Sequence, residues 1–216
     1  LTKYDGACSK RGVQMKPTHL EFRFGPARSG DSDSDPNSIN TAFVLDINGE
    51  KIRVTGQIDR IDVGELDGQK VFSVIDYKSG KKSTLTRDEI ESGERLQLPI
   101  YVEAAQALVF GGDATPLAAG YWSMTGGFDA KGALAVEIEG DPAERWEKVR
   151  GTVEERVGQF VNDIRQGAFQ VESRDKDCTS YCDFRTICRI AQVRSLNKTA
   201  AASGSGTRPS ALDPRL

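Results

Sequence analysis

The fold is decided by residues 56–80, which read GQIDRIDVGELDGQKVFSVIDYKSG. Two apolar, β-branched runs flank the pair Asp67-Gly68, and an Asx-Gly pair between such runs is typical of a two-residue hairpin turn. A hairpin closed at this turn places Asp59 directly opposite Asp76. Because like charges that face each other across a sheet destabilise it, we expect a divalent cation between the two carboxylates.

Lys78 lies two positions beyond Asp76 and therefore shares its face of the strand. The same register places Lys78 opposite Gln57, so this face carries two acids and a lysine. Hydrolysis of an anionic phosphodiester needs cations that neutralise developing charge and activate water, which a carboxylate-bound magnesium ion and a lysine supply. The alternative is that both aspartates are solvent-exposed strand charges, balanced by Arg60 and Lys78.

Hydrophobic periodicity and turn residues predict the other elements. They are a strand at 18–24, an antiparallel meander over 43–78, a helix from Thr86 to about Phe110 with a kink or restart at Pro99, strands at 121–124 and 133–139, and a helix from Asp141 to Gly167. The last helix carries an apolar stripe that we assign to the core: Trp146, Val149, Val153, Val157, Phe160 and Ile164. No periodicity is evident before residue 15.

Composition restricts the class of protein. The 216 residues, 38% of them hydrophobic, are enough for one buried core, and we expect a domain at 1–195 followed by a disordered tail at 196–216. Without a long apolar segment or a signal-peptide pattern, a soluble, cytoplasmic protein with no membrane partner is predicted. Because the chain begins with Leu1, we expect it to be a piece of a longer protein.

The charge does not exclude DNA as a partner. A net charge of −3 is not typical of a dedicated nucleic-acid binder, but an enzyme that acts on DNA needs only a local basic patch. The candidate patch beside the proposed site is Lys78, Lys81, Lys82 and Arg87. Residues 79–84, SGKKST, lack the first glycine of a phosphate-binding loop, so no ATPase is predicted in this chain. Pro36 and Ala42 exclude an EF-hand for the acidic loop at 31–35.

Three segments together resemble a known family: GQIDRID at 56–62, VIDYKSG at 74–80 and LQLPIYVEAAQ at 96–106. Over about residues 18–190 the chain resembles the nuclease domain of the RecB and AddB recombination enzymes, within the PD-(D/E)xK superfamily. The resemblance implies a restriction-endonuclease-like α/β core, with a mixed central β-sheet flanked by helices and a C-terminal cysteine-cluster loop. It also implies that the family's N-terminal helical part, with its metal-binding histidine, is missing here.

The resemblance assigns roles to individual residues. Asp59 and Asp76 match the ligands of a magnesium or manganese ion, helped by the main-chain carbonyl of Tyr77. Lys78 matches the lysine that orients water and stabilises charge. In the family, a helical Gln-x-x-x-Tyr element lies near the DNA, and its members here are Gln97 and Tyr101. From the sequence alone, a partly buried polar pair that packs against the sheet is an equal alternative for these two residues.

Three cysteines, Cys178, Cys182 and Cys188, fall within eleven residues, and this clustering indicates a metal centre. The resemblance implies a 4Fe-4S cluster that is closed by an upstream cysteine, for which Cys8 is the candidate. The spacing is C-x3-C-x5-C, whereas the family has C-x2-C-x5-C. The alternative is a zinc ion held by these three cysteines together with Cys8 or His19. His19 lies outside the family's G-x-x-x-H context, so we expect it to be exposed or packed rather than a ligand of the nuclease metal.

The resemblance also implies the activity. It is Mg²⁺- or Mn²⁺-dependent, exonuclease-type hydrolysis of single-stranded DNA ends in recombinational repair, with a helicase subunit or an upstream helicase-like region as partner. The alternative is a non-catalytic, iron–sulfur-stabilised DNA-binding module of a helicase–nuclease complex, which would keep the fold but lack turnover because the histidine motif is missing.

Overall fold

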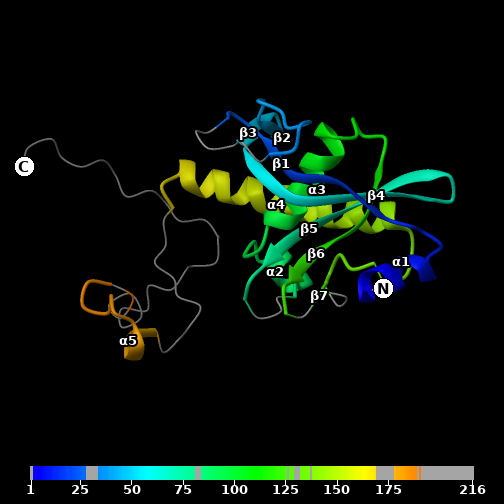
Figure 1. Cartoon of the computed structure of the whole chain (residues 1–216). Coiled ribbons are helices and arrows are strands. Elements are labelled where there is room, and N and C mark those ends of the chain that lie inside the picture. Colours follow the sequence, from blue (N-terminus) through cyan, green and yellow to red (C-terminus); the bar gives the residue numbers. More distant parts are fainter. Residues whose placement is uncertain are drawn as a thin grey trace, which may run out of the picture. The chain divides into compact units, whose positions relative to one another are not determined.

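The structure is a computed structural model that divides into two compact units, Leu1–Val161 and Asn162–Leu216 (Figure 1). It describes residues 2–27, 34–80, 84–125, 127–128, 132–136, 138–168, 178–188 and 190. The predicted tail at 196–216 lies outside these residues. Among the described residues, no helix has the length and apolar character that a membrane crossing requires.

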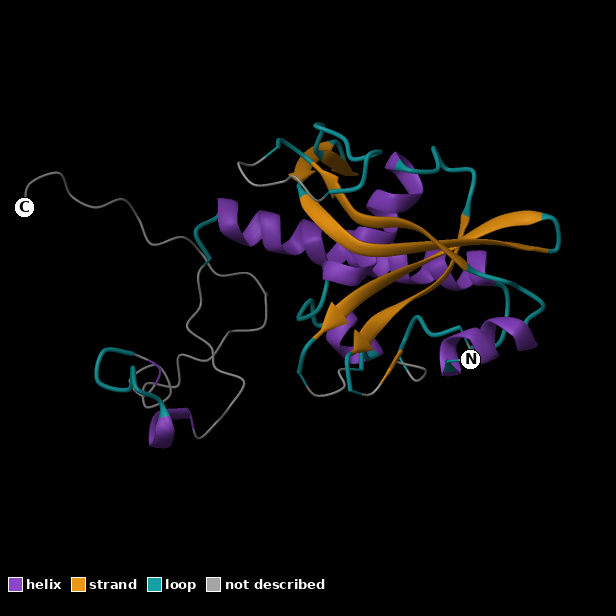
Figure 2. Cartoon of the chain, in the orientation of Figure 1, coloured by secondary structure: helices purple, strands orange, loops and turns teal. Residues whose placement is uncertain are grey.

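The first unit is built on a five-stranded mixed sheet with the order β1-β4-β5-β6-β7 (Figures 1 and 2). The strands are β1 (Lys16–Phe24), β4 (Gly56–Leu66), β5 (Gln69–Lys78), β6 (Thr115–Ser123) and β7 (Gly127–Phe128). β4 is antiparallel to both β1 and β5, whereas β6 is parallel to β5. Parallel neighbours need a crossover connection, and the helices between β5 and β6 supply it. The predicted mixed sheet flanked by helices is confirmed.

The predicted meander over 43–78 is wrong in one respect. β2 (Phe43–Ile47) and β3 (Glu50–Val54) form a separate two-stranded sheet, closed by the expected Asn48-Gly49 turn. A single residue, Thr55, joins β3 to β4. One residue is too short to fold a strand back against its predecessor, so β4 pairs with β1 instead.

The hairpin of β4 and β5 has the predicted turn and the predicted register. Asp67 and Gly68 both have positive φ angles, 53° and 76°, as a type I′ turn requires. The pairs run from Leu66 with Gln69 to Arg60 with Ile75. Asp59 and Asp76 occupy the next positions, where β4 and β5 separate. We call this place the β4–β5 fork.

The register prediction fails beyond the fork. Gln57 pairs with Arg23 of β1, and no pairing joins it to Lys78. Lys78 instead pairs with Ser123 of β6. The strands separate because β5 continues along its parallel partner while β4 continues along β1.

The helices depart from prediction at two places. α1 (Lys3–Lys10) was not expected, although Thr2 and Asp5 form a capping box at its start. The helix predicted from Thr86 begins with its capping box but breaks into α2 (Arg87–Glu91) and α3 (Gln97–Leu108), with Pro99 in the first turn of α3. α4 (Pro142–Arg165) is close to prediction.

The described part of the predicted strand at 133–139 is irregular. Leu134 accepts a single main-chain hydrogen bond from β6, and Ala133 donates a single one to Leu85, so no ladder forms.

Alternate residues of β5 face two different hydrophobic layers. Phe72 and Val74 pack with α3 and α4, whereas Val71 and Ile75 pack with α1. Helices therefore cover both faces of the sheet, and β5 is buried over most of its length. The stripe of α4 enters the core through Trp146, Val149 and Val153.

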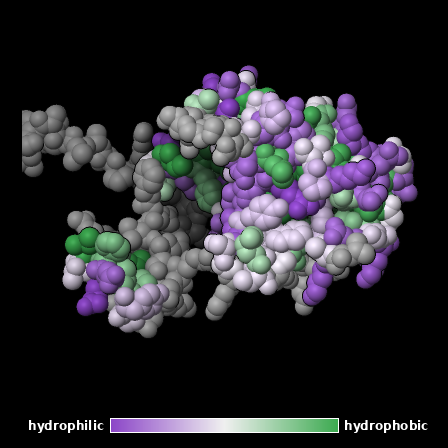
Figure 3. All heavy atoms as spheres, in the orientation of Figure 1, coloured by the Kyte–Doolittle hydropathy of each residue, from purple (hydrophilic) through white to green (hydrophobic). Residues whose placement is uncertain are grey.

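The end of that stripe does not fit the prediction. Phe160 is 41% exposed and Ile164 is 59% exposed. α4 has 24 residues, and the buried part of its stripe ends before these two positions. On the face drawn in Figure 3, hydrophobic areas lie between larger hydrophilic ones.

Candidate active site

The site forms at the β4–β5 fork. The main-chain N–H of Tyr77 donates a hydrogen bond of 2.7 Å to Oδ2 of Asp59. This side-chain contact spans the two strands immediately after their last paired residues, Arg60 and Ile75. The carboxylate of Asp59 is therefore oriented by the strand that carries Asp76.

Asp76 and Lys78 form an ion pair on β5. Nζ of Lys78 lies 2.5 Å from Oδ2 of Asp76, whose side chain is 5% exposed, while the lysine side chain is 40% exposed. The Lys78 ammonium group also lies 5.2 Å from the ring centroid of Tyr121 on β6. These contacts hold a cation beside a nearly buried carboxylate, with one side of the lysine open to solvent.

Gln97 and Tyr101 reach the site from α3. Nε2 of Gln97 donates to Oδ1 of Asp76 at 3.2 Å and to the hydroxyl of Tyr101 at 3.3 Å. The two side chains are four residues apart and share a helix face. The ring of Tyr101 lies over Gly56, where an added Cβ would be 2.8 Å from Cε1 of Tyr101. Glycine at this position leaves room for the tyrosine.

Burial and neighbouring charges shift the pKa values of the site. Burial raises the pKa of Asp59, the Tyr77 N–H opposes this, and the charge of Asp76 adds to it, so the net shift is upward. Burial lowers the pKa of Lys78, but the hydrogen bond and charge of Asp76 outweigh it and the net shift is upward. Lys78 is therefore a stable cation, and Asp59 is a carboxylate whose charged form gains from an added cation.

Glu21 is a further acid that sequence reasoning missed. Its neighbours Leu20 and Phe22 pair with Arg60 and Ile58, so Glu21 occupies the β1 position opposite Asp59. Its charge contributes to the raised pKa of Asp59, and its Oε2 accepts a 2.6 Å hydrogen bond from Gln57. Acids of β1, β4 and β5 thus lie in a row across three strands. The register of β1 against β4 was the missing signal.

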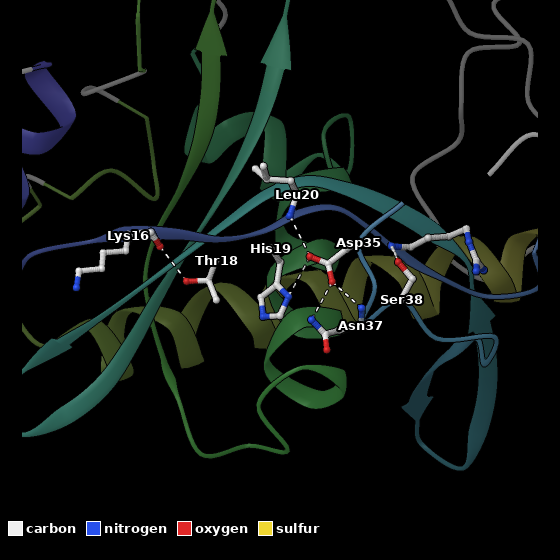
Figure 4. A network of polar contacts seen from close by, with 8 residues as sticks. Lys16, Thr18, His19, Leu20, Asp35, Asn37 and Ser38 are labelled. Atoms are coloured by element: carbon white, nitrogen blue, oxygen red, sulfur yellow. Dashed lines mark hydrogen bonds and ion pairs between the residues drawn. The ribbon is translucent and has the colours of Figure 1, made fainter. Parts of the chain in front are cut away.

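The backbone at Glu21 is held in an unusual conformation. Its φ angle is 55°, in the left-handed region that non-glycine residues rarely adopt. Asp35 stabilises this position, because its N–H donates to the Glu21 carbonyl at 3.2 Å. Its Oδ2 also accepts from the Leu20 N–H at 3.2 Å (Figure 4). Oδ1 of Asp35 accepts from the main chain and side chain of Asn37.

His19 belongs to this supporting network. Its Nδ1 lies 3.3 Å from Oδ2 of Asp35, and its side chain is 12% exposed (Figure 4). Its ring meets Phe22 edge-on, with centroids 5.8 Å apart. This is the packing role that the sequence predicted.

The donor set at the fork suits a hard divalent cation. Magnesium commonly binds one or two carboxylates and completes its shell with water, and Asp59 and Asp76 supply two carboxylates. Among the described residues, no three His, Cys, Asp or Glu side chains are close enough together to hold a metal ion. The fit therefore rests on two carboxylates. A metal-binding role for the Tyr77 carbonyl stays a prediction.

The four cysteines are divided between the two units: Cys8 belongs to the first, and the other three belong to the second. Cys8 lies in α1, is 2% exposed, and packs with Tyr4 and Val71 in the core, where burial raises the pKa of its thiol to about 11. Cys178 and Cys182 lie one helical turn apart at α5 (Cys178–Tyr181) in the second unit, where the N–H of Cys182 donates to the carbonyl of Cys178. Cys188 is exposed, and all four thiols are free.

The predicted basic patch is only partly described. Lys81 and Lys82 lie outside the described residues. Arg87 on α2 pairs with Glu91 at 3.8 Å. Arg95, which the sequence did not single out, lies 5.6 Å from the Tyr121 ring that also contacts Lys78. Two cations therefore share one aromatic ring beside the carboxylates.

The mixed sheet flanked by helices is consistent with a restriction-endonuclease-like fold, and a family match defines the class of protein. A sequence profile described as the PD-(D/E)XK nuclease superfamily matches residues 5–189. The chain belongs to this superfamily.

Several curated proteins are similar to this chain in sequence. The chain is similar to proteins whose names describe a subunit of an ATP-dependent helicase/deoxyribonuclease. The protein of Caldanaerobacter subterraneus is 44% identical over 34% of this chain and 6% of its own length. The protein of Desulforudis audaxviator is 32% identical over 55% of this chain and 10% of its own length. The protein of Carboxydothermus hydrogenoformans is 41% identical over 37% of this chain and 7% of its own length. The matched segments thus span a tenth or less of these relatives.

Proposed function

We propose that this chain is a nuclease domain that hydrolyses DNA phosphodiesters with Mg²⁺ or Mn²⁺. The observation that carries the proposal is the meeting of Asp59, Asp76 and Lys78 at the β4–β5 fork, with Gln97 bonded to Asp76. Superfamily membership supports it. The residues that would hold the metal are Asp59 and Asp76, with the main-chain carbonyl of Tyr77.

Each side chain has a task in this reaction. When bound, the divalent ion supplies positive charge to the phosphate and lowers the pKa of a water molecule. Lys78 orients water and stabilises the negative charge that develops on the phosphate oxygens. Gln97 fixes the orientation of Asp76, and Tyr101 holds Gln97 in place. Arg95 adds positive charge on the same side as Lys78.

The test is degradation of end-labelled DNA by the full chain with Mg²⁺ or Mn²⁺. Asp76→Ala should abolish cleavage, whereas Asp113→Ala, at an exposed position after α3, should cleave at the wild-type rate. Cleavage that survives Asp76→Ala would place the activity in another site or in a contaminant. DNA binding without cleavage by the wild-type chain would favour the non-catalytic binding module.

We propose that the substrate is the end of a single DNA strand and that cleavage is of the exonuclease type. We propose recombinational DNA repair as the role. The proposed partner is a helicase subunit or a helicase-like region. The names of the relatives support a helicase partner, and so does the small share of their length that the chain matches. Comparison of labelled single strands, blunt duplexes and closed circles tests the substrate. A preference for circles would overturn exonuclease-type cleavage. We also propose a cytoplasmic location.

We propose that Cys178, Cys182 and Cys188 hold a 4Fe-4S cluster, with Cys8 as the fourth ligand. The helical turn that brings Cys182, just after α5, into main-chain contact with Cys178 supports the first part, because ligands of one cluster must lie close together. The burial of Cys8 weighs against its role. Zinc is the competing metal, since it also accepts thiolates.

Metal analysis of anaerobically purified protein tests this assignment. The iron cluster predicts broad absorbance near roughly 400 nm and stoichiometric iron. Cys182→Ser should remove both, and Cys8→Ser should do so only if Cys8 is a ligand. Stoichiometric zinc without absorbance would replace the cluster by a zinc site.

A further inference from the structure

Behind the fork lies a buried ion pair that the proposed chemistry does not use. Nε and Nη2 of Arg60 donate to Oδ1 and Oδ2 of Asp62 at 2.6 and 2.7 Å. The Asp62 side chain is 0% exposed and the Arg60 side chain is 16% exposed. Both residues lie on the sheet face opposite Asp59, because they alternate with it along β4. The planar, two-bond contact fixes the direction of the guanidinium group.

The same guanidinium group crosses the fork. Nη1 of Arg60 donates to the hydroxyl of Tyr77 on β5 at 3.2 Å. The centre of the guanidinium group lies 5.5 Å from the Trp122 ring of β6, and that ring meets Tyr77 edge-on with centroids 6.5 Å apart. Arg60 is thus held by Asp62 and by an aromatic ring while it binds the side chain of the opposite strand.

Tyr77 is therefore bound to two consecutive residues of β4. Its hydroxyl accepts from Arg60, and its N–H donates to the carboxylate of Asp59. One contact is made with Arg60, the last residue of β4 that pairs with β5, and the other with Asp59, the first residue beyond that pair. They replace the ladder hydrogen bonds that end at Arg60 and Ile75.

We propose that Arg60 is a positioning residue for the metal site: through Tyr77 it sets the width of the fork and so the distance between the carboxylates of Asp59 and Asp76. The inference rests on the proposed function, because it assigns Arg60 a task in metal binding. Metal sites tolerate deviations of only about 0.2 Å in ligand distance. A fork that opens and closes freely would hold the two ligands less often in a binding geometry.

Two conservative variants test the proposal without leaving Asp62 unpaired. Arg60→Lys keeps a cation beside Asp62 but cannot bind Asp62 with two bonds and also reach Tyr77. Tyr77→Phe keeps the ring and the main chain but removes the acceptor for Arg60. Arg53→Lys, at an exposed position on β3, is the matched control. Arg60→Ala is avoided, because it would strand the buried carboxylate of Asp62.

The measurements are Mn²⁺ affinity by titration calorimetry on the metal-free full chain and hydrogen exchange of the Tyr77 amide. We expect Arg60→Lys to weaken Mn²⁺ binding roughly tenfold or more, as supporting residues around metal sites do. Tyr77→Phe should act in the same direction, and both variants should speed exchange of the Tyr77 amide before any metal is added. Saturating Mn²⁺ should restore most of the cleavage rate.

The outcomes separate this inference from the proposed function. If the wild type binds Mn²⁺ and both variants bind it equally well with unchanged amide exchange, Arg60 does not position the site. If the wild type binds Mn²⁺ but cleaves no DNA, the proposed function fails, while the affinities of the variants still decide the role of Arg60. A wild type that binds no Mn²⁺ overturns both.

Discussion

Tyr77 donates its main-chain N–H to Oδ2 of Asp59 over 2.7 Å, at the point where the hydrogen-bonded ladder of β4 and β5 has ended. A side chain of one strand thus takes the place of the next main-chain acceptor. The contact fixes one oxygen of the Asp59 carboxylate. The fork is therefore a consequence of the sheet topology, and the site depends on it.

Metal affinity should depend on the ionisation of Asp59. Because burial and the charge of Asp76 raise the pKa of Asp59, its proton competes with the metal at a higher pH than for an ordinary aspartate. We expect Mn²⁺ affinity to fall as the pH is lowered toward the raised pKa of Asp59, and the fall to begin at a higher pH than for an aspartate with the ordinary pKa of about 3.9. Asp59→Asn should bind weakly at every pH in titration calorimetry. A wild-type affinity that stays constant down to the ordinary aspartate pKa would contradict the assignment.

Removing the amide of Gln97 should slow cleavage. Gln97→Ala leaves Oδ1 of Asp76 without its α3 donor and frees the Tyr101 hydroxyl, so we expect the turnover rate to fall roughly tenfold. Gln159→Ala, on the exposed part of α4, is the control. Single-turnover cleavage at saturating metal measures the effect. Wild-type turnover in Gln97→Ala would leave this residue as a packing element of the sheet.

Glu103 should make the domain less stable as the pH rises. Burial in α3 raises its pKa to about 7, the charge of Glu154 adds to the shift, and Arg150 opposes it. A carboxyl with a raised folded-state pKa contributes stability below its unfolded pKa and loses it as the pH rises through the folded value. Glu103→Gln should therefore unfold at higher denaturant concentration than wild type at pH 8.

The expected gain from Glu103→Gln is about 1 to 2 kcal/mol, after allowance for the partial exposure of the group. Urea unfolding at two pH values measures it, and the gain should vanish near pH 4. Glu65→Gln, at an exposed position on β4, should be neutral at both. Equal effects of the two substitutions would show that Glu103 is ionised without penalty.

Asp35 should stabilise the strand beside the site. Burial would raise the pKa of Asp35, but the hydrogen bonds from Asn37, His19 and Leu20 outweigh it and lower the pKa. Its stabilisation is therefore present above the unfolded pKa and is lost as the pH falls through the lower folded value. Asp35→Ala should cost about 1 to 3 kcal/mol at pH 7, because it leaves buried donors unpaired.

Thermal unfolding against pH tests this expectation for Asp35. The difference from wild type should shrink as the pH falls below about 4, where the carboxylate is protonated in the unfolded chain. Asp113→Ala serves as an exposed control with no expected change. A pH-independent difference would assign the effect to packing rather than to the charge of Asp35.

The positions of the candidate site residues on β4 and β5 were largely predictable, because the signals that set them are local. The Asp67-Gly68 turn fixes the register of the hairpin, and the register places Asp59 and Asp76 at neighbouring positions across it. The capping box at Thr86 likewise marks the start of α2. Turn and cap chemistry act within a few residues, so a single sequence contains the information.

What the sequence did not reveal depends on contacts between distant segments. Glu21 reaches the site through the pairing of β1 with β4, a register that no turn connects. The separation of β4 from β5 follows from the parallel partner of β5, which lies some forty residues along the chain. Phe160 and Ile164 continue an apolar stripe but lie beyond its buried part.

The two halves of the site differ in how they are supported. Asp76 and Lys78 remain in register with Tyr121 and Ser123 of β6, whereas Asp59 lies on a strand that has left β5. A fluctuation that widens the fork can therefore move Asp59 without breaking the central ladder. Amides of β5 that precede the fork should exchange only with global unfolding, whereas the Tyr77 amide at the fork should exchange by local opening. A cation bound by both carboxylates would therefore connect Asp76, which is held in the central ladder, with Asp59, which can move away from it.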